Sequence, residues 1–218
     1  MKRFEMILMC LLMLTAAGCT EKKETVTEST AEEVPERTYM TVSREIEEAG
    51  GITIQQMILP HDSPRRSGEV REIRGITIHE TDNRYSTADA LAHGNMLLND
   101  RTDITSWHYT VDDHAIVHHL PDNEAAWNAG DNRTRGGGNV NGIGIEMVVA
   151  LGNDYEQTLV NTAELTAALL QTYGLTTEDI HMHADFMDKV CPHRLITEGR
   201  WDEFVGMVEE ICAETEEE

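Results

Sequence analysis

RGITIH, at residues 74–79, is the clearest strand pattern in the chain, because β-branched residues alternate with smaller or polar ones. Weaker patterns of the same kind occur on both sides of it. Two of them, 108–111 and 115–119, predict a hairpin about Asp112 and Asp113. The remaining predicted strands are 52–59, 142–149 and 180–183.

Three segments between and after these strands have helical spacing. Ser86 or Thr87 can cap a helix that continues to about Leu98. The segment 159–173 is amphipathic and stops at Gly174, and 201–211 predicts a last helix. Strands mixed with helices in this way predict an α/β fold, with a single domain built on a mixed central β-sheet flanked by helices.

Length and charge limit what the chain can be. Its 218 residues suffice for one domain with a sizeable core. Lys and Arg number 17 and Asp and Glu number 40, which gives a net charge of −23. A polyphosphate partner needs a basic face, so this balance argues against nucleic acid. It also argues against electrostatic attachment to an anionic membrane.

The N-terminus has the pattern of an export signal. Lys2 and Arg3 precede an uncharged apolar run at 6–14, and small residues then lead to Cys19. The run is too short to span a bilayer. The order resembles a bacterial lipoprotein signal over 1–18, with Cys19 as the lipidated mature N-terminus; an ordinary cleaved signal is the alternative. We expect the protein outside the cytoplasm, anchored to the outer face of the bacterial membrane through that lipid, or else secreted.

Composition divides the rest of the chain. Residues 19–50 are rich in Glu and Thr and predict an acidic linker, because such a segment cannot bury enough apolar surface to fold alone. Residues 51–213 form the predicted domain, and 214–218 are an acidic tail. Nothing in the pattern demands an oligomer, so we expect a monomer.

Histidine and cysteine residues suggest a metal site. His79 ends the strand at 74–79, and residues 181–194 read HMHADFMDKVCPHR, with His183 and Cys191 eight residues apart. Two imidazoles and a thiolate are a zinc ligand set, and three protein ligands leave a fourth position open, as catalytic sites require. Alternation along an extended segment directs His181 and His183 the same way, so the pattern leaves open which of them is the ligand.

The chain resembles the zinc-dependent N-acetylmuramoyl-L-alanine amidases of bacteriophage lysins and bacterial cell-wall hydrolases. These enzymes are relatives of the peptidoglycan recognition proteins. The resemblance covers most of the predicted domain. Five segments carry it: ITIHETDN at 76–83, SWHYTVDD at 106–113, AWNAGD at 126–131, NGIGIEM at 141–147 and HADFMDKVCPHRL at 183–195.

The resemblance implies roles for particular residues. It assigns the zinc ligands to His79, His183 and Cys191, and thereby favours His183 over His181. Lys189 matches the family's catalytic lysine, and Glu146 matches the acid that serves as base in the lysin subgroup. In another subgroup a tyrosine takes part in catalysis where this chain has Trp107. Tryptophan has no proton to transfer, so the role of base falls to Glu146.

The activity that the resemblance implies is zinc-dependent hydrolysis of the amide between N-acetylmuramic acid and L-alanine in peptidoglycan. Two alternatives remain: a non-catalytic peptidoglycan-binding lipoprotein on the same fold, and a domain that zinc merely stabilises. Substrate contacts are expected from four further residues: His108, Trp127, Asn128 and His193. A bridge between Cys191 and Cys212 would destroy the zinc site, so we expect none.

Overall fold

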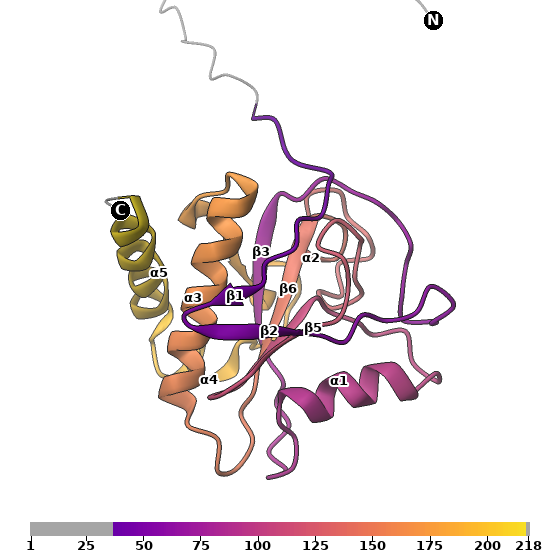
Figure 1. The fold of residues 1–218 in the computed structure, drawn as a ribbon, viewed down its shortest axis with the longest axis horizontal. Coiled ribbons are helices and arrows are strands. Elements are labelled where there is room, and N and C mark those ends of the chain that lie inside the picture. The colour runs from indigo at the N-terminus through magenta and orange to yellow at the C-terminus, as the bar shows by residue number, and fades with distance from the viewer. Residues whose placement is uncertain (1–36, 217–218) are drawn as a thin grey trace, which may run out of the picture. The chain divides into compact units, whose positions relative to one another are not determined.

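The computed structural model describes residues 37–216. The predicted signal at 1–18, Cys19 and the first part of the predicted linker lie outside the described residues. Within the described part, no helix has both the length and the apolar character needed to cross a membrane. Figure 1 shows a mixed β-sheet with helices packed against it.

The sheet has seven strands in the order β1-β2-β5-β4-β6-β3-β7. Their bounds are β1 Glu48–Ala49, β2 Ile52–Gln56, β3 Gly75–Glu80, β4 Tyr109–Val111, β5 Ile116–His118, β6 Gly142–Met147 and β7 Ile180–Met182. β4, β6, β3 and β7 run parallel, while β4 and β5 form the predicted antiparallel hairpin. The single domain with a mixed sheet flanked by helices, predicted from the sequence, is therefore confirmed.

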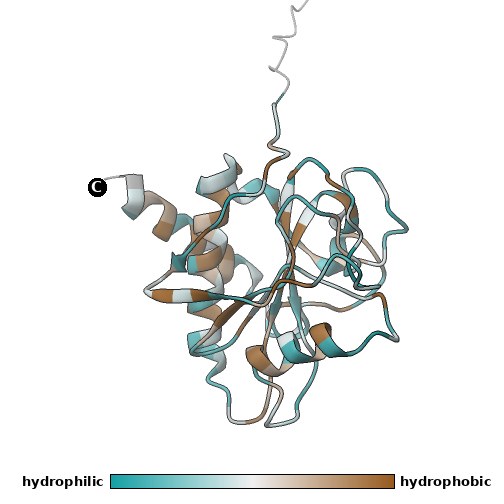
Figure 2. Ribbon diagram, turned by 45° about the vertical axis from the view of Figure 1, so that its right-hand side comes forward, coloured by the Kyte–Doolittle hydropathy of each residue, from teal (hydrophilic) through white to brown (hydrophobic). Residues whose placement is uncertain are grey.

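Side-chain alternation gives the sheet two different faces. Ile76 and Ile78 of β3, like Ile143 and Ile145 of β6, are buried in the main hydrophobic core. Two long helices, α3 Tyr155–Tyr173 and α5 Trp201–Glu216, cover this face. In Figure 2 hydrophobic stretches recur along the helices and central strands, while the surrounding loops are mostly hydrophilic. The opposite face of β3 carries Thr77 and His79, so it is the face available for chemistry.

The helix α1 covers part of the second face. α1 Ala90–Asn99 packs against β4 and β5 over a smaller apolar cluster that includes Leu97 and Trp107. The other short elements are α2 Gly138–Asn141, the 3₁₀ turns η1 Thr177–Asp179 and η2 His183–Asp185, and α4 His193–Thr197.

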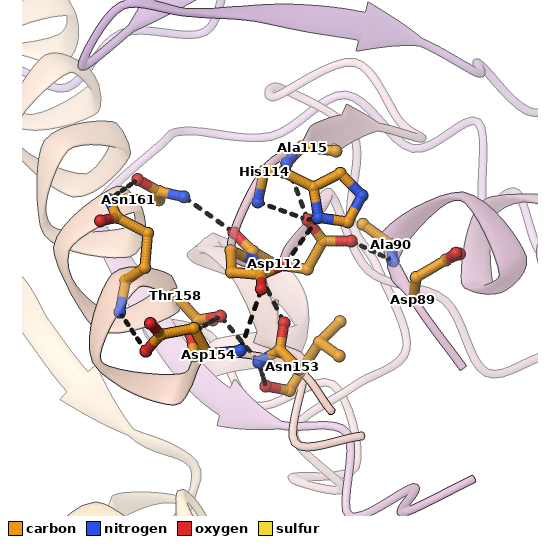
Figure 3. Close-up of polar contacts among 12 residues, drawn as sticks. Asp89, Ala90, Asp112, His114, Ala115, Asn153, Asp154, Thr158 and Asn161 are labelled. Atoms are coloured by element: carbon orange, nitrogen blue, oxygen red, sulfur yellow. Dashed lines mark hydrogen bonds and ion pairs between the residues drawn. The ribbon is translucent and has the colours of Figure 1, made fainter. Parts of the chain in front are cut away.

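Asp112, at the hairpin turn, joins three elements (Figure 3). One carboxylate oxygen accepts hydrogen bonds from the backbone N–H groups of His114 and Ala115 at 2.9 and 2.7 Å, and the other accepts from Ala90 at the start of α1. Its carbonyl accepts from the side chain of Asn161 on α3. The predicted turn therefore also fixes how α1 and α3 meet the sheet.

Two predicted boundaries differ from the structure. Residues 37–50 were expected in the linker, but Arg37 pairs with Asp179 at 2.9 Å, β1 pairs with β2, and Ala49 is buried. Apolar residues scattered through this acidic segment pack on the core, so composition alone misled the interpretation. At the other end, α5 continues to Glu216, into the predicted acidic tail.

Candidate functional site

His79 lies near the carboxyl end of β3, on the face opposite the main core. The parallel register pairs it with Glu146 of β6, so both side chains leave the sheet at the same level. Gly142 and Gly144 lie on the same face of β6 as Glu146 and have no side chains to fill the space above the strand. A Cβ atom at Gly144 would lie 2.6 Å from the Asn128 amide nitrogen. Loop residues can therefore approach His79 closely.

The second ligand-bearing segment follows β7. The strand ends at Met182, and the chain turns at once through η2, which begins with His183. The backbone N–H of Ala184 donates to the Cys191 carbonyl at 3.0 Å and closes the loop between them. This closure brings the two ligands, eight residues apart in the chain, to the same point beside His79.

Three donor atoms converge there. One ligand atom each from His79, His183 and Cys191 lies within 4.8 Å of the others, and all three residues are buried. The Nδ1 atoms of His79 and His183 are 3.0 Å apart, and Cys191 Sγ is 3.9 Å from His79 Nδ1. Two imidazole nitrogens this close need a proton between them or a cation that both can coordinate.

Burial sets the protonation of these ligands. It lowers the pKa of His79 well below its usual value, helped by the charge of Lys189 and by His183. It lowers the pKa of His183 to about 4, again with Lys189 contributing. Burial also raises the pKa of the Cys191 thiol to about 12. The imidazoles are thus neutral, the form that binds metals, while the thiolate needs a cation beside it.

The donor set fits a zinc ion. Imidazole nitrogen and thiolate sulfur are zinc ligands and poor ligands for magnesium or calcium. Four polar atoms of the site are also buried without a hydrogen-bond partner among residues 37–216: His79 Nε2, His183 Nε2, Glu146 Oε2 and Asn128 Oδ1. Unsatisfied buried groups are costly, and their concentration here indicates a site built for a ligand.

Glu146 stands beside the three ligands. Its Oε1 is 4.0 Å from His79 Nδ1. Burial raises its pKa to about 8, although the charge of Lys189 opposes the rise. A carboxyl group with a pKa near neutrality can accept and return a proton under ordinary conditions. Lys189 is exposed on the loop between the ligands, close enough to shift the pKa of four site residues: His79, His183, Glu146 and Cys191.

Glu80 is a residue that the sequence interpretation missed. It accepts hydrogen bonds from the Tyr155 hydroxyl at 2.7 Å and from the Arg194 backbone N–H at 2.9 Å. Its carboxylate thereby ties α3 and the start of α4 to the end of β3, and holds the segment that follows Cys191. A charged residue directly after His79 on a buried strand was the available signal.

His108, which was expected among the substrate contacts, lies inside the domain. The side chain is fully buried, and its Nδ1 accepts a hydrogen bond from the Gly144 backbone N–H at 2.9 Å. Its Nε2 therefore carries the proton and donates to the Glu124 carbonyl at 2.9 Å. Both ring nitrogens are used inside the domain, so His108 supports β6 from within.

The other residues considered are spread around the site. His181 pairs with Thr77 and packs against Phe186, away from the three ligands. Asn128 lies against Gly144, and its side chain raises the pKa of His79. Trp127 is half-buried at the edge of a surface hollow, and His193 is exposed at the start of α4. Cys191 is not bridged to Cys212.

Comparison with known proteins identifies the family. A family model described as N-acetylmuramoyl-L-alanine amidase matches residues 69–194, which include His79, Glu146, His183 and Cys191. The chain belongs to the N-acetylmuramoyl-L-alanine amidase family. The amidase XlyA of Bacillus subtilis is 36% identical over 153 residues, which are 70% of this chain and 50% of XlyA. The amidase CwlH of the same organism is 34% identical over 71% of this chain and 60% of its own length.

Solved structures agree with this assignment. The catalytic domain of XlyA superposes with a TM-score of 0.68 at 33% identity, covering 72% of this chain and 99% of that domain. The chain therefore contains the equivalent of a whole amidase-family domain. It spans between 41% and 60% of the length of the three Bacillus subtilis amidases XlyA, CwlH and XlyB.

Proposed function

We propose that this protein hydrolyses the amide bond between N-acetylmuramic acid and L-alanine in peptidoglycan, and that the reaction depends on zinc. The observation that carries the proposal is the convergence of His79, His183 and Cys191 within 4.8 Å, with Glu146 beside them. Membership of the amidase family supports the choice of substrate. The three ligands leave room for a fourth, as in catalytic zinc sites.

His79, His183 and Cys191 would hold the zinc ion. Bound there, it would act as a Lewis acid on the substrate carbonyl and lower the pKa of an attacking water. Glu146, as a carboxylate, accepts the proton of the attacking water and passes it to the leaving amine of L-alanine. Lys189 supplies positive charge where the carbonyl oxygen becomes negative, a contribution of about 3–4 kcal/mol by analogy with oxyanion-hole donors.

Digestion of purified peptidoglycan tests the proposal. The expected products carry a free L-alanine amine and an intact lactyl carboxylate on muramic acid, both identifiable by mass spectrometry. A chelator should abolish their formation, and added zinc should restore it. Cleavage between two sugars or within the peptide would contradict the bond choice, and full activity in chelator would contradict the zinc requirement.

The proposal includes a location. We propose that the domain acts outside the cytoplasm, held at the membrane by a lipid on Cys19. The support is the sequence pattern of residues 1–19. Mass spectrometry of the mature N-terminus tests it: the mass of a diacylglyceryl group on Cys19 is expected, and an unmodified N-terminus would contradict it.

A further inference from the structure

A surface hollow lies beside the amidase site. Its volume is about 530 Å³, and its lining includes Ile104, Thr105, Trp127, Asn132, Arg133 and Asn139. The guanidinium carbon of Arg133 lies 5.1 Å from the centre of the Trp127 ring. The hollow therefore combines an apolar wall with a cation stacked on an aromatic ring.

Short contacts connect the lining of the hollow to the segments that carry Glu146 and Lys189. Asn139 lines it, and its Oδ1 accepts hydrogen bonds from the backbone N–H groups of Asn128 and Ala129 at 2.8 and 2.7 Å. Asn128 in turn lies against Gly144, two residues before Glu146. On the other side, Gly130 contacts Met187, which is on the loop that carries Lys189. The hollow therefore lies near the residues proposed to act on the substrate.

The backbone that presents Arg133 is strained. Asn132 and Arg133 are consecutive non-glycine residues with φ of 54° and 63°, in the left-handed region. Such a conformation is costly, and strained residues concentrate at binding and catalytic sites.

Charge indicates which part of the substrate binds there. The chain has a net charge of −23, so most of its surface repels an anion. Arg133 is half-exposed and pairs with Glu69 through Nη2, which is the only atom of its guanidinium with a partner among residues 37–216. Its remaining N–H groups can pair with a carboxylate. Of the two parts of the substrate, the stem peptide carries carboxylates.

We propose that the hollow lined by Trp127 and Arg133 binds the stem peptide of the substrate, with Arg133 pairing with a carboxylate of that peptide. This inference rests on the proposed amidase function and adds a determinant of specificity to it. The enzyme should prefer stem peptides with free carboxylates to those whose carboxyl groups are amidated.

Two substrates test the inference: a muramoyl tripeptide with free carboxylates, and the same compound with those groups as carboxamides. For the wild type we expect kcat/KM about tenfold higher on the first, mostly through KM, as a charge-assisted hydrogen bond would give. Arg133→Gln should bring the ratio close to one, and Arg133→Lys should keep part of the preference. Arg135→Gln, on the same loop, is the matched control and should keep the wild-type ratio.

The outcomes separate this inference from the function on which it rests. If the wild type cleaves neither compound, the proposed function is wrong. If it cleaves both and Arg133→Gln leaves the ratio as it was, only the inference is wrong. Calorimetry with the released tripeptide provides a readout independent of turnover: Arg133→Gln should weaken binding about tenfold, and equal affinity for both proteins would overturn the inference.

Discussion

The choice between His181 and His183 shows how far single residues could be predicted. Both were candidates because alternation directs them to one side of an extended segment. In the structure β7 ends at Met182, and the turn that follows carries His183 to His79 while His181 stays beside Thr77. Strand ends are set by tertiary contacts, so spacing alone could not decide, and the family resemblance did.

The burial of His108 could not be predicted from the sequence. Its neighbours in the sequence predicted a position near the site, and it does lie next to β6. Its full burial, however, depends on the loop that supplies the Glu124 carbonyl, a contact between segments 16 residues apart. A polar residue on a strand cannot be assigned to a groove or to the interior until its partners are known.

Glu146 gives the first prediction at this scale. Glu146→Gln keeps the size of the side chain but cannot accept a proton, so kcat should fall about 100-fold or more while zinc content is retained. The measurement is hydrolysis of a muramoyl peptide together with metal analysis. Glu210→Gln, on the exposed surface of α5, should behave as the wild type. Undiminished turnover in Glu146→Gln would show that another group is the base.

His108 gives a prediction about pH. Burial, with the charge of Arg71, lowers its pKa to about 3. Above pH 6.5 the histidine is neutral in both folded and unfolded chains; below it, the unfolded chain gains a proton that the folded one refuses. Its contribution to stability is therefore complete above pH 6.5 and falls by about 1.4 kcal/mol per pH unit between 6.5 and 3.

Urea unfolding at pH 7.5 and pH 5 measures this effect. His108→Asn should lose less stability between the two pH values than the wild type. His114 provides a control of opposite sign, because Asp113 raises its pKa and its contribution is present at low pH and lost as pH rises. His114→Gln should therefore lose more stability on acidification. If His108→Asn loses as much stability between pH 7.5 and pH 5 as the wild type does, the lowered pKa of His108 is not the cause of the loss.

At the scale of the elements, strands and helices were predicted more reliably than their starts. The first helix was expected to begin after Ser86 or Thr87, but Asp89 is its N-cap, and its side chain accepts from the Ala92 N–H at 2.7 Å. All three residues are good caps. The bond from the Ala90 N–H to Asp112 fixes the start, and that contact is not visible in the local sequence.

The long helix α3 also starts earlier than predicted. Apolar periodicity begins at Leu159, whereas the helix begins at Tyr155, after the N-cap Asp154. Its end at Gly174 was predicted correctly, and Gly174 has the left-handed φ of 65° that favours glycine there. The glycine at 174 marks the end of the helix clearly in the sequence. The first turn has no apolar periodicity, so only the capping residue Asp154 indicates the start.

Asp154 gives the prediction at this scale. Its side chain accepts from the N–H groups of Glu156 and Gln157 at 3.1 and 3.2 Å. Asp154→Ala leaves these donors without that acceptor and should lower the free energy of unfolding by about 1 kcal/mol. Asp154→Asn keeps an accepting oxygen and should lose less. Urea denaturation of the three proteins measures the difference, and equal losses in both variants would argue against capping as the cause.

At the scale of the whole molecule, the fold class was predictable and the N-terminal boundary was not. The segment 37–49 has an acidic composition, yet it is attached to the domain along its length. Ser43 accepts a hydrogen bond from the Asp122 N–H at 3.0 Å, and the Arg44 N–H donates to the Tyr173 hydroxyl at 2.9 Å. These contacts join residues more than 75 positions apart, so no local pattern reveals them.

Truncation tests the boundary. A chain that starts at Arg37 should unfold at the same urea concentration as the protein without its signal. A chain that starts at Gly51, the boundary predicted from composition, should lose roughly 3 kcal/mol or more, because the apolar contacts of Tyr39, Met40 and Ile46 with the core are removed. Equal midpoints for the two truncated chains would show that the segment adds nothing to stability.

Zinc content of the purified protein tests the account most directly. Metal analysis should find about one zinc ion per chain in the wild type and in Cys212→Ser, whose cysteine lies on α5 outside the site. Cys191→Ser should lose most of that zinc, and its hydrolysis of peptidoglycan should fall with it. An unchanged zinc content in Cys191→Ser would contradict the ligand set on which the proposed chemistry depends.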